Sequence, residues 1–342
     1  MESIYNYSYA NLENLLLENH FKKYNASQIF DWLYKKKVSS FNEMSNLSKS
    51  LIDFLNNTFC IDCIKLINRL SDNETVKYLC ELSDKNHIEC VLMKHNYGNS
   101  LCVSSQIGCN MGCMFCESGR LKKVRDLTTS EMLNQVISIE KHENVRIDNI
   151  VIMGIGEPFD NFVNVINFVK LLIDPKCLSI GQRKITISTS GIIPKIREFG
   201  ELDTQVNLAI SLHASCDEVR NKLMPINKAY PIKDLMVAVD EYIKKTNRRV
   251  TIEYILIDGI NDTKEDALEL CKLLKGKLVY VNLIPYNETS NFKFKRSKVF
   301  NINSFYDILK KNKIEVTVRR EMASKLKGAC GQLRSEKEED LC

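Results

Sequence analysis

The chain has 342 residues, of which 44% are hydrophobic, and a formal net charge of +5. This length is enough to bury the core of one large and one small domain, and the longest apolar runs are too short to cross a membrane. The 13 cysteines are irregularly spaced, and the N-terminus lacks a basic-then-apolar leader. We therefore expect a cytoplasmic protein with reduced thiols, some of them used for a metal or for catalysis.

Residues 1–85 are expected to form a small N-terminal helical domain. Apolar residues recur at helical spacing between Leu12 and Leu33, and a further helix is predicted over residues 49–57. At about residue 86 this pattern gives way to shorter, β-branched apolar runs.

Residues 86–333 show strand-length apolar runs alternating with amphipathic helical stretches, which predicts an α/β fold. Because parallel strands covered by helices follow from this order, about six such units predict a partial (β/α)6 barrel with its chemistry at the strand ends. The predicted strands cover residues 87–93, 101–106, 149–153, 184–189, 206–212, 250–256, 278–284 and 315–319. The predicted helices cover residues 130–142, 162–173, 232–245, 264–274 and 304–311. Residues 334–342 are expected to form a charged, solvated tail.

Three cysteines, Cys109, Cys113 and Cys116, form a C-x3-C-x2-C loop with an aromatic residue before the last cysteine. Three thiolates leave one position open on a metal centre that takes four ligands, which suits a 4Fe–4S cluster with one free iron. This pattern resembles the loop of radical S-adenosylmethionine (SAM) enzymes, in which the free iron chelates SAM. A zinc loop with a distant fourth ligand, or thiols that only pack, are the alternatives. Glycines around these cysteines favour the cluster, because they leave room for the backbone to wrap it.

Polar residues follow four of the later predicted strands. The segment Gly154-Ile-Gly156-Glu157-Pro158 is either an ordinary tight turn or a place where backbone approaches a ligand and Glu157 accepts from an ammonium group. Ser188, His213 and Asn287 end further strands. A single histidine there is usually structural, but polar groups at consecutive strand ends favour one shared ligand.

Two more cysteines stand apart from the loop. Small residues flank Cys330 and leave it sterically open, and Cys102 lies on a predicted strand just before the loop. From the pattern alone each is interpreted as an inert thiol. Lysine and arginine clusters are also scattered along the chain, and each by itself indicates a solvated surface more than a phosphate contact.

Taken together, these segments resemble the RlmN/Cfr family of radical SAM RNA methyltransferases over nearly the whole chain. The matching segments are residues 28–34, 41–47, 102–109, 154–158, 188–191, 211–214, 223–227, 282–285 and 329–333. The resemblance implies methylation of an adenine carbon, C2 in RlmN and C8 in Cfr. An amidine carbon is too weak a nucleophile to attack the methyl group of SAM directly, so a radical route is needed.

The resemblance also implies roles for individual residues. In the family scheme Cys330 takes a methyl group from one SAM, and a second SAM, cleaved at the cluster, provides the radical that activates this S-methyl group for addition to adenine. Cys102 then releases the product by forming a transient disulfide with Cys330. Glu89 matches the proton acceptor of the family, although without the resemblance it is interpreted as a surface strand glutamate.

The same resemblance implies one 4Fe–4S cluster on Cys109, Cys113 and Cys116, and two SAM molecules per turnover. The SAM contacts fall on Gly156, Glu157, Ser188, Ser211, Leu212, His213 and Asn287. The implied partners are 23S rRNA at the peptidyl transferase centre, tRNA next to the anticodon, a flavodoxin- or ferredoxin-type electron donor and a thiol reductant. The N-terminal domain is expected to bind RNA, and the chain is expected to be a monomer.

Pro158 favours the RlmN branch, since Cfr proteins often have alanine at this position. Two departures stand out: Lys325 and Lys327 replace two acids that the family usually has before its methylated cysteine, and Asp126 replaces an asparagine. The lysines invert the local charge, which favours contact with phosphate. Two alternatives stay open: C8 methylation of the same rRNA adenosine, which confers antibiotic resistance, and a radical SAM maturase or small-molecule enzyme that does not act on RNA.

Overall fold

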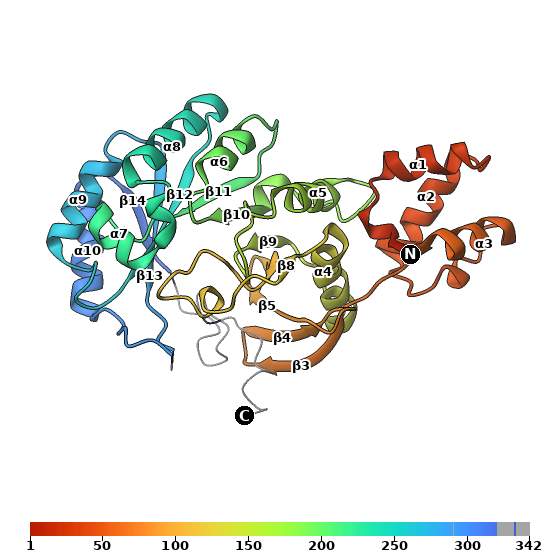
Figure 1. Ribbon diagram of the computed structural model, residues 1–342, viewed down its shortest axis with the longest axis horizontal. Helices are drawn as coiled ribbons and strands as arrows, with labels where there is room; N and C mark the ends of the chain where they lie inside the picture. The colour runs from red at the N-terminus through yellow and green to blue at the C-terminus, as the bar shows by residue number, and fades with distance from the viewer. Residues whose placement is uncertain (290, 320–331, 333–342) are drawn as a thin grey trace.

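The computed structural model describes residues 1–289, 291–319 and 332 (Figure 1). Three helices form a separate lobe at one end of the long axis: α1 (Tyr9–Glu18), α2 (Tyr24–Phe30) and α3 (Lys49–Thr58). A short parallel pair, β1 (Glu2–Ser3) with β2 (Phe59–Cys60), joins the two ends of this lobe. The side chains of Ser8 and Ser48 cap α1 and α3 by accepting backbone N–H groups of the first turn. The predicted helical domain is therefore present.

A ten-stranded sheet forms the rest of the molecule, in the order β14-β13-β12-β11-β10-β9-β6-β5-β4-β3. In this sheet β6 and the strands from β9 to β14 run parallel, and β3 to β6 pair antiparallel. The bounds are β3 (Lys65–Ser71), β4 (Thr75–Glu81), β5 (His87–His95), β6 (Gly98–Val103), β9 (Asn149–Ile152), β10 (Ile185–Thr189), β11 (Asn207–Ser211), β12 (Val250–Leu256), β13 (Val279–Pro285) and β14 (Glu315–Val318). A separate two-stranded ribbon pairs β7 (Gln106–Ile107) with β8 (Arg125–Asp126).

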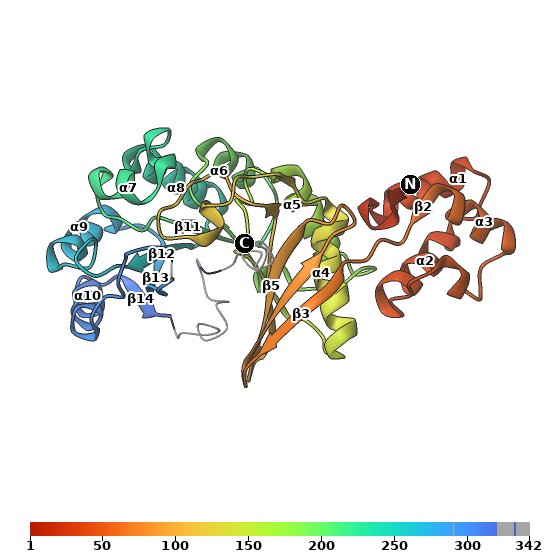
Figure 2. The ribbon, with the colours of Figure 1, turned by 60° about the horizontal axis from the view of Figure 1, so that its bottom comes forward.

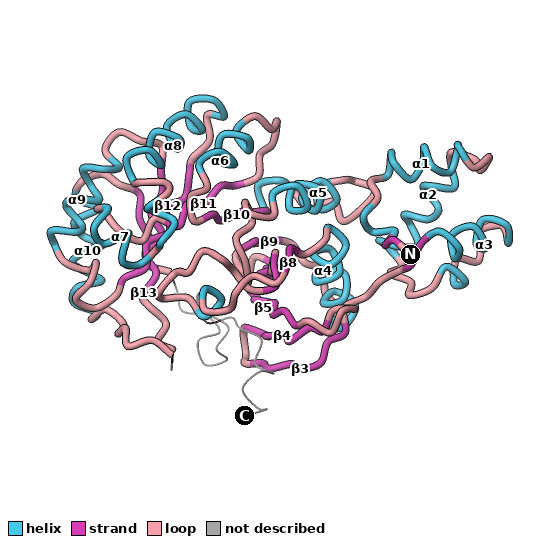
Figure 3. The backbone as a smooth tube through the Cα atoms, in the orientation of Figure 1, coloured by secondary structure: helices cyan, strands magenta, loops and turns pink. Residues whose placement is uncertain are grey.

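Helices connect each pair of consecutive parallel strands, as right-handed crossover geometry requires. They are α4 (Thr129–Glu143), α5 (Phe162–Ile173), α6 (Ile193–Gly200), α7 (Asp217–Leu223), α8 (Ile232–Thr246), α9 (Lys264–Leu274) and α10 (Val299–Lys311). Figures 1 and 3 show the sheet as an open arc with α6, α8, α9 and α10 along its outer side. The predicted partial (β/α)6 barrel is confirmed, with β14 as an additional strand after the last helix.

The boundary of the helical lobe differs from the expectation. Its helices end at Thr58, and residues 65–81, which we expected to lie in the helical domain, form β3 and β4 of the main sheet. The turn between them is closed by Asp72, whose carboxylate accepts from the backbone of Glu74 and Thr75. β4 is buried over nearly its whole length between β3 and β5, so its pattern lacks the alternation that marks a half-exposed strand.

The helical lobe packs against α4 and the region after α5 (Figure 2). Lys37 forms an ion pair of 2.8 Å with Glu140, and the Lys176 ammonium lies 3.3 Å from the centre of the Tyr9 ring. Within the described ranges, no helix combines the length and the apolar composition that crossing a membrane requires.

Candidate active site

The carboxyl ends of the parallel strands surround a pocket that is partly open to solvent. Cys109, Cys113 and Cys116 all line it. Of the predicted SAM contacts, the pocket brings together Gly156, Glu157, Ser188, Ser211 and His213. The remaining two are not among the described residues that line it: Leu212 is fully buried in the hydrophobic core, and Asn287 lies beyond the end of β13.

The cysteine loop is held by backbone contacts on both sides. The N–H of Cys109 donates to the carbonyl of Leu121 at 2.9 Å, and the N–H of Met114 donates to the carbonyl of Leu223 at 2.9 Å. Gly108 has φ +72°, and a Cβ there would lie 2.2 Å from the Lys122 carbonyl oxygen. Only glycine at this position lets the cysteine loop pass so close to the backbone of residue 122.

The donor set of this loop fits an iron–sulfur cluster. Burial raises the pKa of the Cys109 thiol to about 12 and that of Cys113 well above its usual range, so both need a cationic centre to become thiolates. Among the described residues, no three histidine, cysteine, aspartate or glutamate side chains converge tightly enough to hold a single metal ion. Three thiols that line one pocket, on a loop closed by glycine, are suitable ligands for the corners of a cluster.

Glu157 joins the ends of β9 and β10. Its carboxylate accepts from the backbone N–H of Phe159 at 3.0 Å and from that of Ser190 at 2.7 Å. Burial raises the pKa of this carboxyl, although the hydrogen bonds oppose the shift. Next to it, the hydroxyls of Ser188 and Ser211 lie 3.4 Å apart across β10 and β11.

His213 lies in the pocket as a neutral imidazole. Its backbone has φ 59°, and its Nδ1 accepts from the N–H of Ile255 at 3.1 Å. Burial, with a smaller effect from Arg220, lowers its pKa to about 3. Since Nδ1 is an acceptor, Nε2 carries the hydrogen and is available as a donor. The ring also packs edge-on against Phe115 at 4.9 Å.

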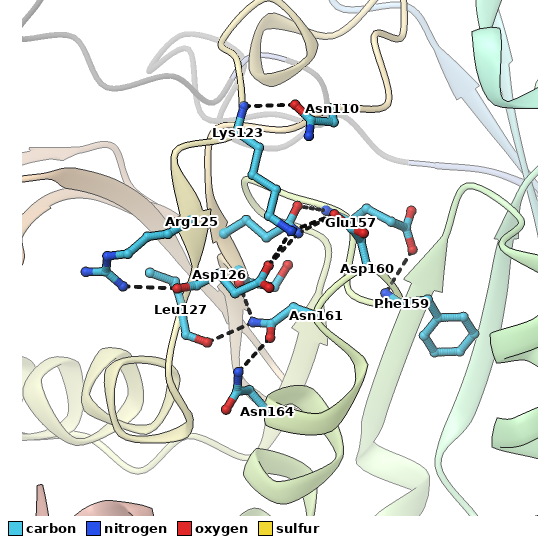
Figure 4. Close-up of polar contacts among 12 residues, drawn as sticks. Asn110, Lys123, Arg125, Asp126, Leu127, Glu157, Phe159, Asp160, Asn161 and Asn164 are labelled. Carbon is cyan, nitrogen blue, oxygen red and sulfur yellow. Dashed lines mark hydrogen bonds and ion pairs between the residues drawn. The ribbon is translucent and has the colours of Figure 1, made fainter. Parts of the chain in front are cut away.

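A polar network beside the pocket was not predicted (Figure 4). Lys123 Nζ lies 2.8 Å from both Asp126 and Asp160, and Gln106 Nε2 donates to the same two carboxylates at 2.8 and 2.9 Å. The Gln106 carbonyl oxygen accepts from the N–H of Glu157 at 2.8 Å, which connects the network to the pocket. The negative charge of Asp126 is thus neutralised by Lys123, which the fold also places beside Asp160.

Glu253 and Arg319 also line the pocket and were missed by the sequence reasoning. Glu253 is on β12, accepts from Asn282 Nδ2 at 2.8 Å, and has a pKa raised by burial. Its only sequence signal is a charged residue inside an otherwise apolar strand.

Glu89 is fully buried on β5, so its interpretation as a surface glutamate is wrong. Its carboxylate forms an ion pair of 2.8 Å with Lys77 on β4. Cys102 on β6 lies opposite Val91 and packs with it and with Ile155 of the glycine-rich turn, on the face of the sheet that also carries Glu89. Cys330 lies outside the described residues, as do Lys325 and Lys327.

Comparisons with known proteins cover the whole chain. Residues 103–272 match the family model "Radical SAM superfamily", and residues 3–61 match "Ribosomal RNA large subunit methyltransferase N-terminal domain". The chain is 50% identical to "Probable dual-specificity RNA methyltransferase RlmN" of Acholeplasma laidlawii, over 97% of this chain and 99% of that protein. It is 52% identical to the protein of the same name from Spiroplasma citri, over 99% of each. The crystal structure of a radical SAM methyltransferase from Sphaerobacter thermophilus superposes with a TM-score of 0.94 at 39% identity, covering 98% of this chain and 100% of that one.

Proposed function

We propose that this chain methylates C2 of adenosine in RNA. The chain belongs to the radical SAM superfamily and, within it, to the RlmN RNA methyltransferases. The chain is a SAM-dependent RNA methyltransferase, and the proposed targets are 23S rRNA at the peptidyl transferase centre and tRNA at the adenosine 3′ of the anticodon. The observation that carries the proposal is the three-cysteine loop, which lines the same pocket as the polar strand ends of β9, β10 and β11.

The radical SAM superfamily uses a 4Fe–4S cluster and SAM, and the RlmN enzymes use two SAM molecules per turnover. We propose that Cys109, Cys113 and Cys116 hold the cluster. When bound, cluster and SAM together supply a 5′-deoxyadenosyl radical that abstracts hydrogen.

The pocket residues would hold SAM by donating and accepting at fixed positions. The positive φ of Gly156, +109°, leaves the backbone at this turn close to the pocket without a side chain in the way. Ser188 and Ser211 offer two neighbouring hydroxyls, and His213 offers a neutral Nε2–H donor. Glu157 holds the ends of β9 and β10 in register, since its two oxygens are bound to backbone of both loops. Leu212 and Asn287 stay proposed SAM contacts on the resemblance alone, since neither is among the described residues that line the pocket.

The methyl group would travel through the thiols and carboxylate of this chain. The Cys330 thiolate attacks the methyl carbon of SAM, forming an S–C bond as the sulfonium S–C bond breaks. Glu89, whose carboxylate lies 2.8 Å from the Lys77 ammonium, would take the proton that leaves the adenine carbon. The Cys102 thiol would then attack the Cys330 sulfur, so that an S–S bond forms as the S–C bond to the product breaks, and the released carbon would take the thiol proton to complete the methyl group. The remaining electron of the radical adduct would return to the cluster, and a thiol would reduce the disulfide.

We propose that the N-terminal helical lobe, whose last helix ends at Thr58, is an RNA-binding accessory domain, and that the sheet domain, which begins with β3 at Lys65 and not at residue 86, is catalytic and extends to residue 333, with 334–342 as a charged tail. A flavodoxin- or ferredoxin-type protein would provide the electron. A monomer in the cytoplasm is consistent with rRNA and tRNA as substrates.

Cys330→Ala tests the proposal in vitro. The purified, cluster-loaded variant should still cleave SAM reductively but should transfer no methyl group to a 23S rRNA fragment, because the methyl carrier is gone. Methyl transfer by Cys330→Ala would contradict the mechanism. If the cluster-loaded wild-type enzyme methylates none of the RNAs tested, a maturase or small-molecule enzyme would be favoured instead.

A further inference from the structure

Lys77 on β4 and Glu89 on β5 form an ion pair inside the protein. The Lys77 Nζ lies 2.8 Å from Glu89 Oε1, and only 2% of the lysine side chain and 1% of the glutamate side chain are exposed. Taking two charges out of water costs several kcal/mol for each ion, and apolar side chains of similar volume are often as stable in such a place. Stability alone therefore does not account for the pair.

The ion pair lies beside the Cys102 thiol. Lys77, Val91 and Cys102 are register partners across β4, β5 and β6, so their side chains form one row on the same face of the sheet. Glu89 is two residues before Val91 and shares this face, because side chains alternate along a strand. The Cys102 side chain is only partly buried, so solvent reaches this face at the thiol. The proposed proton acceptor, the proposed resolving thiol and a buried cation thus share one face of the sheet.

The backbone of Glu89 is anchored to the glycine-rich turn. Ser104 Oγ donates to the Glu89 carbonyl at 2.6 Å and accepts from the N–H of Ile155 at 3.0 Å. The side-chain amide of Gln135 binds the N–H and the carbonyl of Ser104 at 2.9 and 3.0 Å, so the hydroxyl itself is held in place. Ile155 directly precedes Gly156, which lines the pocket. With its backbone fixed beside the pocket, Glu89 has a carboxylate whose position depends on its side-chain contacts, and Lys77 provides a charged one.

We propose that Lys77 is a positioning residue for proton abstraction, which holds the Glu89 carboxylate in place and supplies its counter-charge. This inference rests on the proposed function, in which Glu89 is the proton acceptor. In that step the C–H bond of the adenine carbon breaks, the proton forms an O–H bond with Glu89, and the electron pair of the broken bond stays on the adduct. Lys77 gives up no proton. A buried carboxylate that loses its counter-charge tends to become protonated, and a protonated carboxyl cannot act as a base.

The test separates the cleavage of SAM from the transfer of the methyl group. Cluster-loaded protein is supplied with SAM, dithionite as reductant and a 23S rRNA fragment, and 5′-deoxyadenosine and 2-methyladenosine are quantified in the same samples by mass spectrometry. In Lys77→Met the ratio of 2-methyladenosine to 5′-deoxyadenosine should fall about tenfold or more, since a general base contributes about 10²–10⁴-fold. The rate of 5′-deoxyadenosine formation should match that of the wild type. Lys77→Arg keeps the charge and should recover most of the ratio.

Lys277→Met is the matched control. Lys277 is also a largely covered lysine, with 19% of its side chain exposed, and it pairs with Asp240 at 2.5 Å. It lies just before β13, at the end of the strand away from the pocket, so its product ratio should equal that of the wild type. In case Lys77→Met does not fold, Lys77→Gln removes the charge but keeps an amide that can donate to the carboxylate, and its ratio should fall in the same direction.

Glu89→Gln distinguishes the failure of this inference from the failure of the proposed function. A wild-type protein that makes no 2-methyladenosine contradicts the proposed function, and a Glu89→Gln variant with the wild-type ratio contradicts the role of Glu89 on which the inference rests. A low ratio in Glu89→Gln together with the wild-type ratio in the folded, uncharged variants at position 77 overturns the inference about Lys77. Loss of both products in equal proportion in those variants overturns it as well, because a purely structural role would lower both alike.

Discussion

Lys123 is the residue whose removal should be most informative about the network beside the pocket. It bridges Asp126 and Asp160 at 2.8 Å each, and all three side chains are only partly exposed, at 18%, 37% and 34%. Each half-screened ion pair contributes about 0.5–1 kcal/mol, so Lys123→Met should lower the free energy of unfolding by about 1–2 kcal/mol. The loss also leaves two carboxylates that share the amide of Gln106, and their repulsion adds to the cost.

The departure at position 126 makes a double-mutant cycle possible. Asp126→Asn alone should cost about 0.5–1 kcal/mol, because it removes one pair. In the Lys123→Met background the same change should be nearly neutral or stabilising, because it removes the repulsion with Asp160. The free energies of unfolding of the two single variants and the double variant are measured on the cluster-loaded protein. Urea is the denaturant, because guanidinium chloride would screen the charges. Additive effects within about 0.3–0.5 kcal/mol would refute the view that Lys123 compensates for Asp126.

Three further predictions follow from the buried ion pair, the cysteine loop and the exposed edge of the sheet. Lys77→Met should destabilise the protein by about 3–5 kcal/mol, measured by urea denaturation, because it removes the cation that lies 2.8 Å from the fully buried Glu89 carboxylate; a loss under about 1 kcal/mol would show that the pair is not a major contact. Gly108→Ala should abolish iron binding, measured by iron content, since its Cβ would clash with backbone, whereas Gly181→Ala, with its nearest atom at 4.0 Å, should bind iron normally. The hydrogen bond from Arg69, against the effect of burial, lowers the pKa of Glu143 to about 2. The ionised Glu143 carboxylate therefore stabilises the folded protein fully above its pKa in the unfolded chain, about 4.5, and this contribution is lost as the pH falls towards 2. The urea midpoints of the wild type and of Glu143→Gln should accordingly converge as the pH falls from 4.5 to 2, and midpoints that stay equally far apart would contradict this role of Glu143.

Most long periodic elements could be predicted from the sequence, whereas two short helices, α6 and α7, and the strand β4 could not. α5, α9 and β12 have the predicted bounds, because their patterns extend over several turns or a full strand. α6 and α7 have only eight and seven residues, too few for a clear helical period. β4 is buried on both faces, so it lacks the alternation that identifies a strand.

In the candidate site, the residues that lie together in one short segment could be predicted, and those whose partners are distant in the sequence could not. Cys109, Cys113 and Cys116 are recognisable because their chemistry lies in one short segment. Gln106 and Arg220 were missed because their partners are distant in the sequence: Gln106 binds Asp160, and Arg220 binds the carbonyl of Ser190. No local pattern distinguishes such residues from a surface glutamine or arginine, and only the crossover topology brings their partners together.

The most direct measurement of the central claim is mass spectrometry of nucleosides from 23S rRNA and tRNA of a host that lacks its own enzyme and expresses this chain. We expect 2-methyladenosine in both RNAs with the wild-type chain, and none with Cys330→Ala. Appearance of 8-methyladenosine without 2-methyladenosine, or no methylated adenosine from a cluster-loaded protein, would contradict it.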